Sequence, residues 1–166
     1  SISGTDAALF NIDANTGVVT FKSAPDYEAP ADAGGNNIYD IKVTASDGTN
    51  SATKDVAIKV TDVNEGPVIT SGTTASFAEN GTGTAYTATA TDPDAGTTLT
   101  YSIGGADAAL FNIDAATGVV TFKSAPDYEA PADAGGNNVY DIKVTASDGT
   151  NSTTQAVAIT VTNVNE

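Results

Sequence analysis

The chain contains no cysteine, histidine, methionine, tryptophan or arginine. Without cysteine and histidine it has no disulfide bond, no zinc site of the usual ligand types and no Ser-His-Asp catalytic triad. Basic residues are also scarce, because 6 lysines stand against 21 acidic residues and give a formal net charge of -15. This acidic balance disfavours nucleic acid and anionic membranes as partners. We therefore expect no nucleic-acid binding and no thiol or imidazole chemistry.

Long hydrophobic segments are missing as well. No apolar run approaches the ~20 residues of a membrane-spanning helix, so we predict no membrane insertion. No signal peptide is visible either. The chain begins in the middle of a repeat, which predicts that it is an interior piece of a longer protein.

The residues that are abundant favour strands and turns. Asp, Gly, Thr, Asn and Ser are typical of turns and strand ends, whereas Val, Ile and Thr are typical of strands. Apolar residues make up 40% of the chain, which is enough for a packed core. The composition therefore predicts an all-β protein.

An internal repeat organises the chain. Residues 1–65 match residues 102–166 at a constant offset of 101, and nine of these 65 positions differ, which leaves 56 identical. A period near 100 residues is too long for a solenoid unit and has the size of a β-sandwich domain. We predict a partial repeat at 1–65 that lacks its first strands, followed by a complete repeat at 66–166.

The complete repeat shows about seven strand-like segments, at 74–78, 85–91, 99–103, 110–113, 119–122, 140–146 and 157–161. The last two alternate apolar and polar residues, as half-buried strands do. In the first copy Lys59 lies between two apolar residues, so we expect its side chain to face water.

The partial repeat should have open sheet edges and an uncovered core, because its first strands are missing. We expect a missing N-terminal segment or a partner chain to complete it. A homo-oligomer, including a strand-swapped dimer formed through this incomplete repeat, is one such arrangement.

Acidic residues gather where strands are expected to end. The pentapeptide DYEAP occurs at 26–30 and again at 127–131, and each copy places two carboxylates one residue apart. Taken singly, such acids read as solvated turn residues, and Asp148 precedes a glycine as in a tight hairpin. Asp13 and Asp114 read as turn formers, and the loop ADAGGNN around Asp32 and Asp133 reads as flexible surface. The ordered set of acids instead favours a cation site.

Six motifs in order resemble tandem cadherin-like repeats of the kind found in large bacterial surface adhesins. SFAEN (76–80) resembles the first-strand glutamate motif, and ATDPDAG (90–96) resembles the Asp-x-Asp motif. LFNIDAATGVVTF (110–122) resembles the mid-repeat hairpin, and DYE resembles the Asp-Arg-Glu motif. TASDG (145–149) resembles the late-aspartate motif, and TDVNEGPVI (61–69) resembles the linker. The resemblance implies a Greek-key β-sandwich in each repeat and a linear array of tandem repeats.

The resemblance also implies Ca²⁺ ions between successive repeats. Carried onto this chain, the junction ligands are Asp26, Glu28, Asp62, Asn64, Glu65, Asp92, Asp94 and Asp148, with the carbonyl of Val63. Half of a second site is expected at Glu79, Asp127, Glu129, Asn165 and Glu166, whereas Asp47 is the mirror case, whose upstream partners are missing. Ca²⁺ takes ~6–8 oxygen ligands of these types.

The resemblance implies an extracellular or cell-surface structural module whose partners are neighbouring repeats of the same chain. In this hypothesis bound Ca²⁺ stiffens a rod-like array that serves cell adhesion. The alternative is an adhesive module that itself binds glycans or other copies of the repeat. Paired carboxylates can hydrolyse glycosides, but these acids lie at a junction rather than in a cleft, so we do not expect an enzyme.

Overall fold

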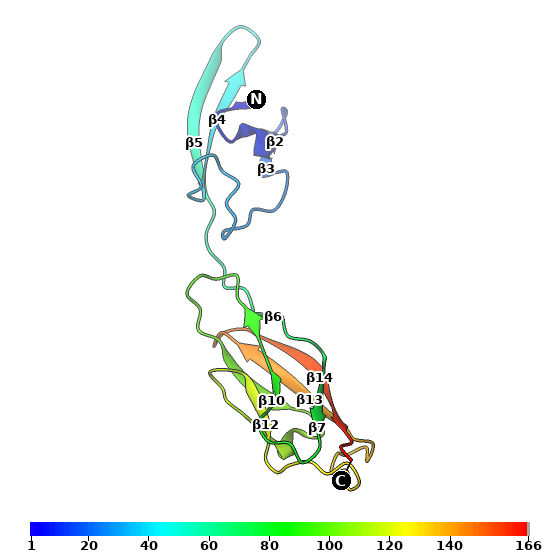
Figure 1. The fold of residues 1–166 in the computed structure, drawn as a ribbon. Coiled ribbons are helices and arrows are strands. Elements are labelled where there is room, and N and C mark those ends of the chain that lie inside the picture. The colour runs from blue at the N-terminus through cyan, green and yellow to red at the C-terminus, as the bar shows by residue number, and fades with distance from the viewer. Residues whose placement is uncertain (166) are drawn as a thin grey trace. The chain divides into compact units, whose positions relative to one another are not determined.

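The chain forms two compact units, Ser1–Val63 (unit 1) and Asn64–Glu166 (unit 2), in a computed structural model that describes residues 1–165 (Figure 1). Strands dominate both units, and each unit also contains one three-residue 3-10 turn within the described residues. The predicted all-β class is confirmed.

Unit 2 is a sandwich of short and long strands. Its elements are β6 (Val68–Ile69), β7 (Thr74–Ala78), β8 (Thr84–Thr87), β9 (Ala90–Thr91), β10 (Thr100–Gly104), η2 (Ala108–Leu110), β11 (Phe111–Ile113), β12 (Val119–Phe122), β13 (Val139–Ser147) and β14 (Ser152–Thr162). One sheet has the order β10-β13-β14-β7 and a second has the order β11-β12-β8. Strand β6 pairs with β9 beside them. The hydrophobic core is built by both of the larger sheets.

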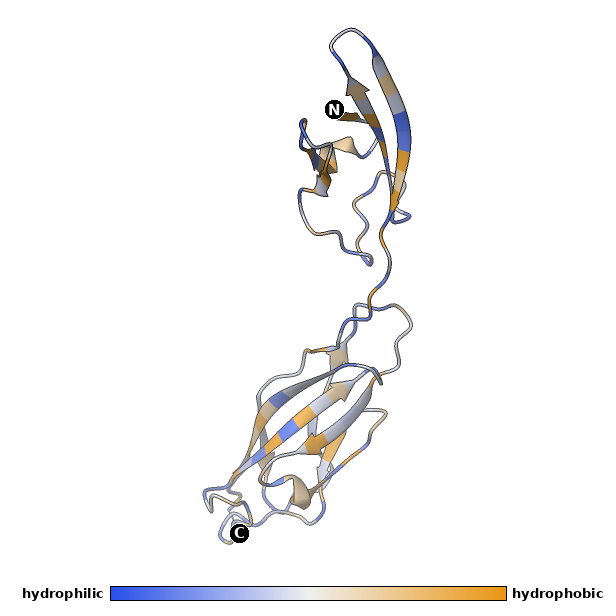
Figure 2. Ribbon diagram, turned by 180° about the vertical axis from the view of Figure 1, so that it is seen from behind, coloured by the Kyte–Doolittle hydropathy of each residue, from blue (hydrophilic) through white to orange (hydrophobic). Residues whose placement is uncertain are grey.

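The two long strands of unit 2 follow the period of two that the sequence predicted. In β13 the side chains of Tyr140, Ile142, Val144 and Ala146 are buried, and the residues between them are more exposed. Figure 2 shows hydrophobic and hydrophilic residues alternating along these strands. The alternation arises because successive side chains of a strand point to opposite faces of the sheet.

Strand β7 lies where the sequence placed it and closes the edge of the larger sheet. It runs parallel to β14, with Thr74 opposite Ala158 and Ala78 opposite Thr162. All other strand pairs of unit 2 within the described residues are antiparallel. Strand β7 therefore joins the start of unit 2 to its last strand.

The expected strand at 85–91 is wrong as one continuous element. It divides into β8, which pairs with β12, and β9, which pairs with β6. The chain changes partners at Ala88 and Thr89, where the amide of Ala88 donates to the carbonyl of Gly118 and the carbonyl of Thr89 accepts from Thr70. Strand β6 has two residues, which is too short for any alternation to reveal it.

Unit 1 repeats the second half of unit 2. Its elements are β1 (Ile2–Ser3), η1 (Ala7–Leu9), β2 (Phe10–Ile12), β3 (Val19–Phe21), β4 (Ile38–Ser46) and β5 (Ser51–Lys59). Strands β1, β4 and β5 form one sheet, and β2 pairs with β3. Strands β4 and β5 keep the register of β13 and β14, since Tyr39 lies opposite Ile58 as Tyr140 lies opposite Ile159. Lys59 is exposed, as predicted.

The interpretation of Asp32 and Asp133 as flexible surface is wrong. Both side chains are buried, and Asp133 accepts hydrogen bonds from the amides of Asn137 and Asn138 at 3.0 Å each. Asp32 binds the two equivalent amides in unit 1. A glycine-rich loop thus wraps around one carboxylate, which satisfies backbone groups that water would otherwise bind.

Candidate metal centres

Unit 2 gathers acidic and amide side chains at the end where it begins. We call Asn64, Glu65, Asp92, Asp94 and Asp148 the proximal cluster. The side-chain amide of Asn64 donates to Oδ2 of Asp148 at 2.7 Å, and the backbone N–H of Glu65 donates to Oδ2 of Asp94 at 3.0 Å. The start of the unit is therefore tied to the loop after β9 and to the turn between β13 and β14.

Asp148 is held by its turn as well as by Asn64. Its Oδ1 accepts the backbone N–H groups of Thr150 and Asn151 at 2.6 Å each. The Asn64 amide, followed by these turn amides, holds the pKa of the Asp148 carboxyl below its ordinary value of 3.8. Donors that favour the charged form keep this carboxylate ionised, as a cation ligand must be.

Asp92 carries the observation that points most directly to a cation. Its Oδ1 accepts the backbone N–H of Asp94 at 3.0 Å. Its Oδ2 is buried and has no hydrogen-bond partner among the described residues. Removing a carboxylate oxygen from water without a partner is costly, so such an oxygen is normally paired or bound to a metal.

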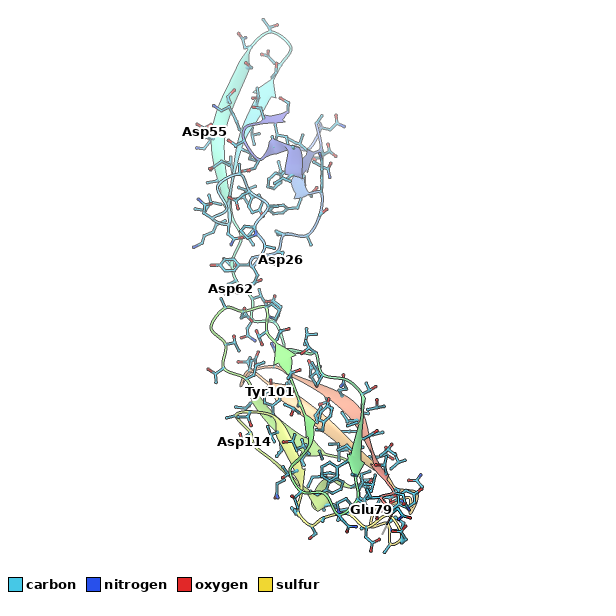
Figure 3. All side chains as sticks on the ribbon, viewed as in Figure 1. Asp26, Asp55, Asp62, Glu79, Tyr101 and Asp114 are labelled. Atoms are coloured by element: carbon cyan, nitrogen blue, oxygen red, sulfur yellow. The ribbon has the colours of Figure 1, made fainter. Side chains whose placement is uncertain are left out.

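A second group lies where strands β7 and β14 end. We call Glu79, Asp127 and Glu129 the distal cluster, and one carboxylate oxygen from each lies within 4.8 Å of the others. Figure 3 labels Glu79 at this end of unit 2. Three negative charges this close repel one another unless a cation or donor groups compensate them.

Backbone amides compensate Glu79 in part. Its Oε1 accepts the N–H of Val164 at 2.6 Å, and its Oε2 accepts the N–H of Tyr128 at 2.8 Å. These two bonds, the one from Val164 first, hold the pKa of the Glu79 carboxyl below its ordinary value of 4.5. Glu79 is nearly fully buried, so its charge is fixed in place by the backbone.

The Asp-x-Glu motif has the same local structure in both units. Oδ1 of Asp127 accepts the N–H of Glu129 at 2.9 Å, and Oδ1 of Asp26 accepts the N–H of Glu28 at 3.0 Å. In each copy the aspartate closes the turn with one oxygen, so its other oxygen and the glutamate are available as ligands.

The remaining predicted residues of unit 1 lie in turns or extended backbone. Oδ1 of Asp47 accepts two turn amides, as Asp148 does. Asp62 and Val63 follow β5 and are exposed. Within the distal half-site, Asn165 is also exposed, and Glu166 lies outside the described residues.

The proximal and distal clusters are separate centres. Asn151 precedes the first residue of β14 and Asn163 follows its last, and each donates to one of the clusters. β14 has 11 residues. At the usual rise of a strand, this length places the two clusters on the order of 35 Å apart.

Sequence reasoning did not assign a role to these two asparagines. The side-chain amide of Asn151 donates to the carbonyl of Asn64 at 2.9 Å, and that of Asn163 donates to Oε1 of Glu129 at 2.7 Å. They orient the clusters from the two ends of β14. The only available signal was their position beside strand ends.

Comparison with known proteins identifies the family. The model of the cadherin domain family matches residues 73–162, more than half of the chain. The chain belongs to the cadherin domain family. It is 33% identical over 137 residues to human protocadherin Fat 4, covering 76% of this chain, and equally identical to the mouse protein. The chain spans only 3% of the length of these relatives.

Solved structures agree on the cadherin fold. The EC1-2 region of human protocadherin-24 matches 99% of this chain and 81% of that one, with a TM-score of 0.67 and 23% identity. Mouse cadherin-23 EC22-24 matches 98% of this chain and 52% of that one, at 0.61 and 26%. Protocadherin gamma B7 extracellular cadherin domains 1-4 match all of this chain and 42% of that one, at 0.63 and 25%.

Family membership fixes the broad class of the protein. Cadherin domains are typically Ca²⁺-binding adhesion modules of extracellular proteins rather than enzymes. Among the described residues, no helix has the length and hydrophobicity needed to cross a membrane. The predicted all-β, cadherin-like fold is thereby confirmed.

Proposed function

We propose that this cadherin chain is a calcium-binding structural module of an extracellular surface adhesin. The observation that carries the proposal is the buried, unpartnered Oδ2 of Asp92. The oxygen lies in a cluster that also contains Asp94, Asp148 and Glu65, joined by hydrogen bonds through Asn64. A hard cation with oxygen ligands suits this donor set, and Ca²⁺ accepts carboxylates, amide oxygens and carbonyls together.

The proposed ligands come from two consecutive repeats. The proximal cluster of one repeat supplies Asn64, Glu65, Asp92, Asp94 and Asp148. We assign Asp26, Glu28, Asp62 and the carbonyl of Val63 of the preceding repeat to the same ions. Glu79, Asp127 and Glu129 are the equivalent ligands toward a following repeat. The Asp-x-Glu turn, which is alike in both units, supports this assignment.

Bound Ca²⁺ would stiffen the array by removing electrostatic repulsion. Seven of the assigned junction residues carry carboxylates, and without a cation these charges oppose a fixed arrangement of the repeats. Ions that bind only the folded, aligned state also stabilise it. One site at a free Ca²⁺ concentration 100 times its dissociation constant contributes ~2.7 kcal/mol.

The near-identity of the two copies favours a spacer role in a long array of the bacterial adhesin type. The copies share 56 of 65 aligned positions, so neither carries a distinctive recognition surface. An adhesive module that itself binds glycans or other copies of the repeat is the alternative. Glycan-array binding by the isolated chain would favour that alternative.

Isothermal titration with Ca²⁺, combined with thermal unfolding, tests the proposal. The native chain should bind Ca²⁺ and unfold at a higher temperature when the ion is present. The double variant Asp92→Asn/Asp94→Asn should lose most of the binding and most of the shift in unfolding temperature. Both replacements keep the side-chain size and remove only the charge.

Asp55→Asn is the matched control. Asp55 lies outside both clusters, forms an exposed ion pair with Lys42 at 3.1 Å, and corresponds to Ala156 in the other copy. The variant changes the net charge without removing a proposed ligand, so its Ca²⁺ binding should match that of the native chain. If the native chain does not respond to millimolar Ca²⁺, the proposed function is wrong.

A further inference from the structure

Units 1 and 2 share their last four strands but not what covers them. Strand β14 has two neighbours, β13 and β7. Strand β5 is its counterpart at the offset of 101, and among the described residues it pairs only with β4. The outer edge of β5 therefore presents unpaired backbone groups, as an edge strand does.

Identical side chains record the missing cover. Val120 and Val144 have no exposed surface, whereas their counterparts Val19 and Val43 are half-buried. Ile159 is also fully buried, and its counterpart Ile58 is half-buried. The side chains and the strand register are the same in both units. The difference in exposure therefore measures a layer that unit 1 lacks.

Two glycines show where part of that layer lies. A Cβ on Gly118 would meet the carbonyl oxygen of Ala88 at 2.2 Å, and the N–H of Ala88 donates to the carbonyl of Gly118 at 2.9 Å. Gly17 is the counterpart of Gly118 and has a similar φ of +75°, yet nothing lies within 4 Å of such a Cβ. The space over Gly17 is the place that Ala88 occupies in unit 2.

We propose that the edge of β5 and the open face of unit 1 form a docking site for an unfolded polypeptide segment with the sequence pattern of residues 66–101. In the docked state the counterpart of β7 adds parallel to β5, and the counterpart of β8 adds antiparallel to β3. Unit 2 gives the register: Ala158 lies opposite Thr74, which places Ala57 opposite the same threonine of the segment. Addition of a strand to an open sheet edge is a general mode of peptide recognition.

The segment must carry specific apolar side chains. In unit 2 the rings of Phe77 and Phe122 lie 5.2 Å apart, and Tyr86 is buried in the core. Phe21 is the counterpart of Phe122 and is half-buried in unit 1. A docked segment would therefore place its own Phe77 against Phe21 and bury the exposed half of that ring.

A folded second copy is a poor donor of these strands. Each chain contains one set of the strands β6 to β9 and two units that need such a set. A swap would uncover unit 2 of the donor to the same extent as it covers unit 1 of the acceptor. Because the swap would expose as much apolar surface as it buries, we assign the site to a segment that is not already part of a folded unit.

The test adds a synthetic peptide of residues 66–101 to the full chain in calcium-free buffer and follows amide hydrogen exchange by NMR. In unit 2 the N–H of Ala158 faces β7 and donates to Thr73 at 3.0 Å, so the N–H of Ala57 faces the open edge. The amide of Ala57 should exchange rapidly in the chain alone and become protected when the peptide is added. The amide of Val60 bonds to Asn37 in the same unit and serves as the internal reference.

Two variants make the result specific. A peptide carrying Phe77→Ala should bind at least about tenfold more weakly, because it loses a buried aromatic anchor. Ala57→Pro in the chain removes only an N–H that faces the open edge, a position where proline is tolerated in sheets, and should abolish protection by the native peptide. Equal binding of the native and Phe77→Ala peptides overturns the proposal.

The chain alone provides a further check. If the amide of Ala57 is already protected without peptide and sedimentation shows a dimer, another copy covers the edge and the proposal is wrong. Because these readings are made without Ca²⁺, they stand or fall separately from the proposed calcium function.

Discussion

The carboxylate of Glu79 binds the backbone amide of Val164, 85 residues further along the chain. Its other oxygen binds the amide of Tyr128. One side chain thus joins the end of β7, the turn of the Asp-x-Glu motif and the segment after β14. The predicted metal ligand is also a structural clamp, and this double role determines how it should respond to pH.

The stability of unit 2 should fall in acid because of Glu79. The pKa of its carboxyl is below 4.5 in the folded unit, so the unfolded chain binds more protons there. Its contribution to stability is complete above the unfolded pKa and is lost as the pH falls through the folded pKa. Urea unfolding between about pH 6 and pH 3 should show Glu79→Gln losing less stability on acidification than the native chain.

That experiment is read as a difference, since other carboxylates titrate in the same range. Asp114 is the matched reference, because turn amides also lower its pKa and Glu79→Gln leaves it untouched. Native and Glu79→Gln chains with the same dependence on pH would show that the clamp does not favour the charged form.

The paired substitutions Gly118→Ala and Gly17→Ala should separate backbone strain from steric overlap. Both glycines have positive φ, so each replacement destabilises its unit by about 1 kcal/mol. Only at Gly118 would the new Cβ also meet Ala88. Gly118→Ala should therefore lower the free energy of unfolding of unit 2 by at least about 2 kcal/mol more than Gly17→Ala lowers that of unit 1. Thermal unfolding of the two variants checks this, and equal effects would contradict it.

Truncation of equivalent core residues should have unequal effects. Ile159→Ala removes a fully buried side chain and should destabilise unit 2 by about 3 kcal/mol. Ile58→Ala removes a half-buried side chain and should destabilise unit 1 by about 1 kcal/mol. Calorimetry that resolves the unfolding of the two units measures both. In the presence of the docked segment 66–101, the effect of Ile58→Ala should approach that of Ile159→Ala.

Removal of the Asn64 side chain should change the titration of Asp148. The Asn64 amide is the first cause of the lowered pKa of Asp148, so Asn64→Ala should raise that pKa toward 3.8. Asp47 keeps the equivalent turn amides and is the internal control, since the substitution leaves its contacts unchanged. NMR titration of both carboxyls gives the answer. An unchanged pKa of Asp148 would mean that the contact with Asn64 does not stabilise the charge.

Strands with clear alternation were predictable because their periodicity is local. The segments 74–78 and 119–122 match β7 and β12 in full, and the turn role of Asp114 is confirmed by its bonds to the amides of Ala116 and Thr117. The division of 85–91 was not predictable, since the change of partner at Ala88 depends on two strands distant in sequence. The burial of Asp133 was missed for the same kind of reason, because a polar loop gives no local sign that it closes around its own aspartate.

The amino-acid sequence alone determined the all-β class, the offset of 101 and the acidic character of the strand ends. These properties depend on residue type and spacing, which need no knowledge of distant contacts. Only the tertiary structure decided that Asp92 keeps a buried oxygen without a partner and that β14 is covered where β5 is open. Burial depends on which segments pack together, and two nearly identical sequences reach different burial when only one has β7 and β8 beside it.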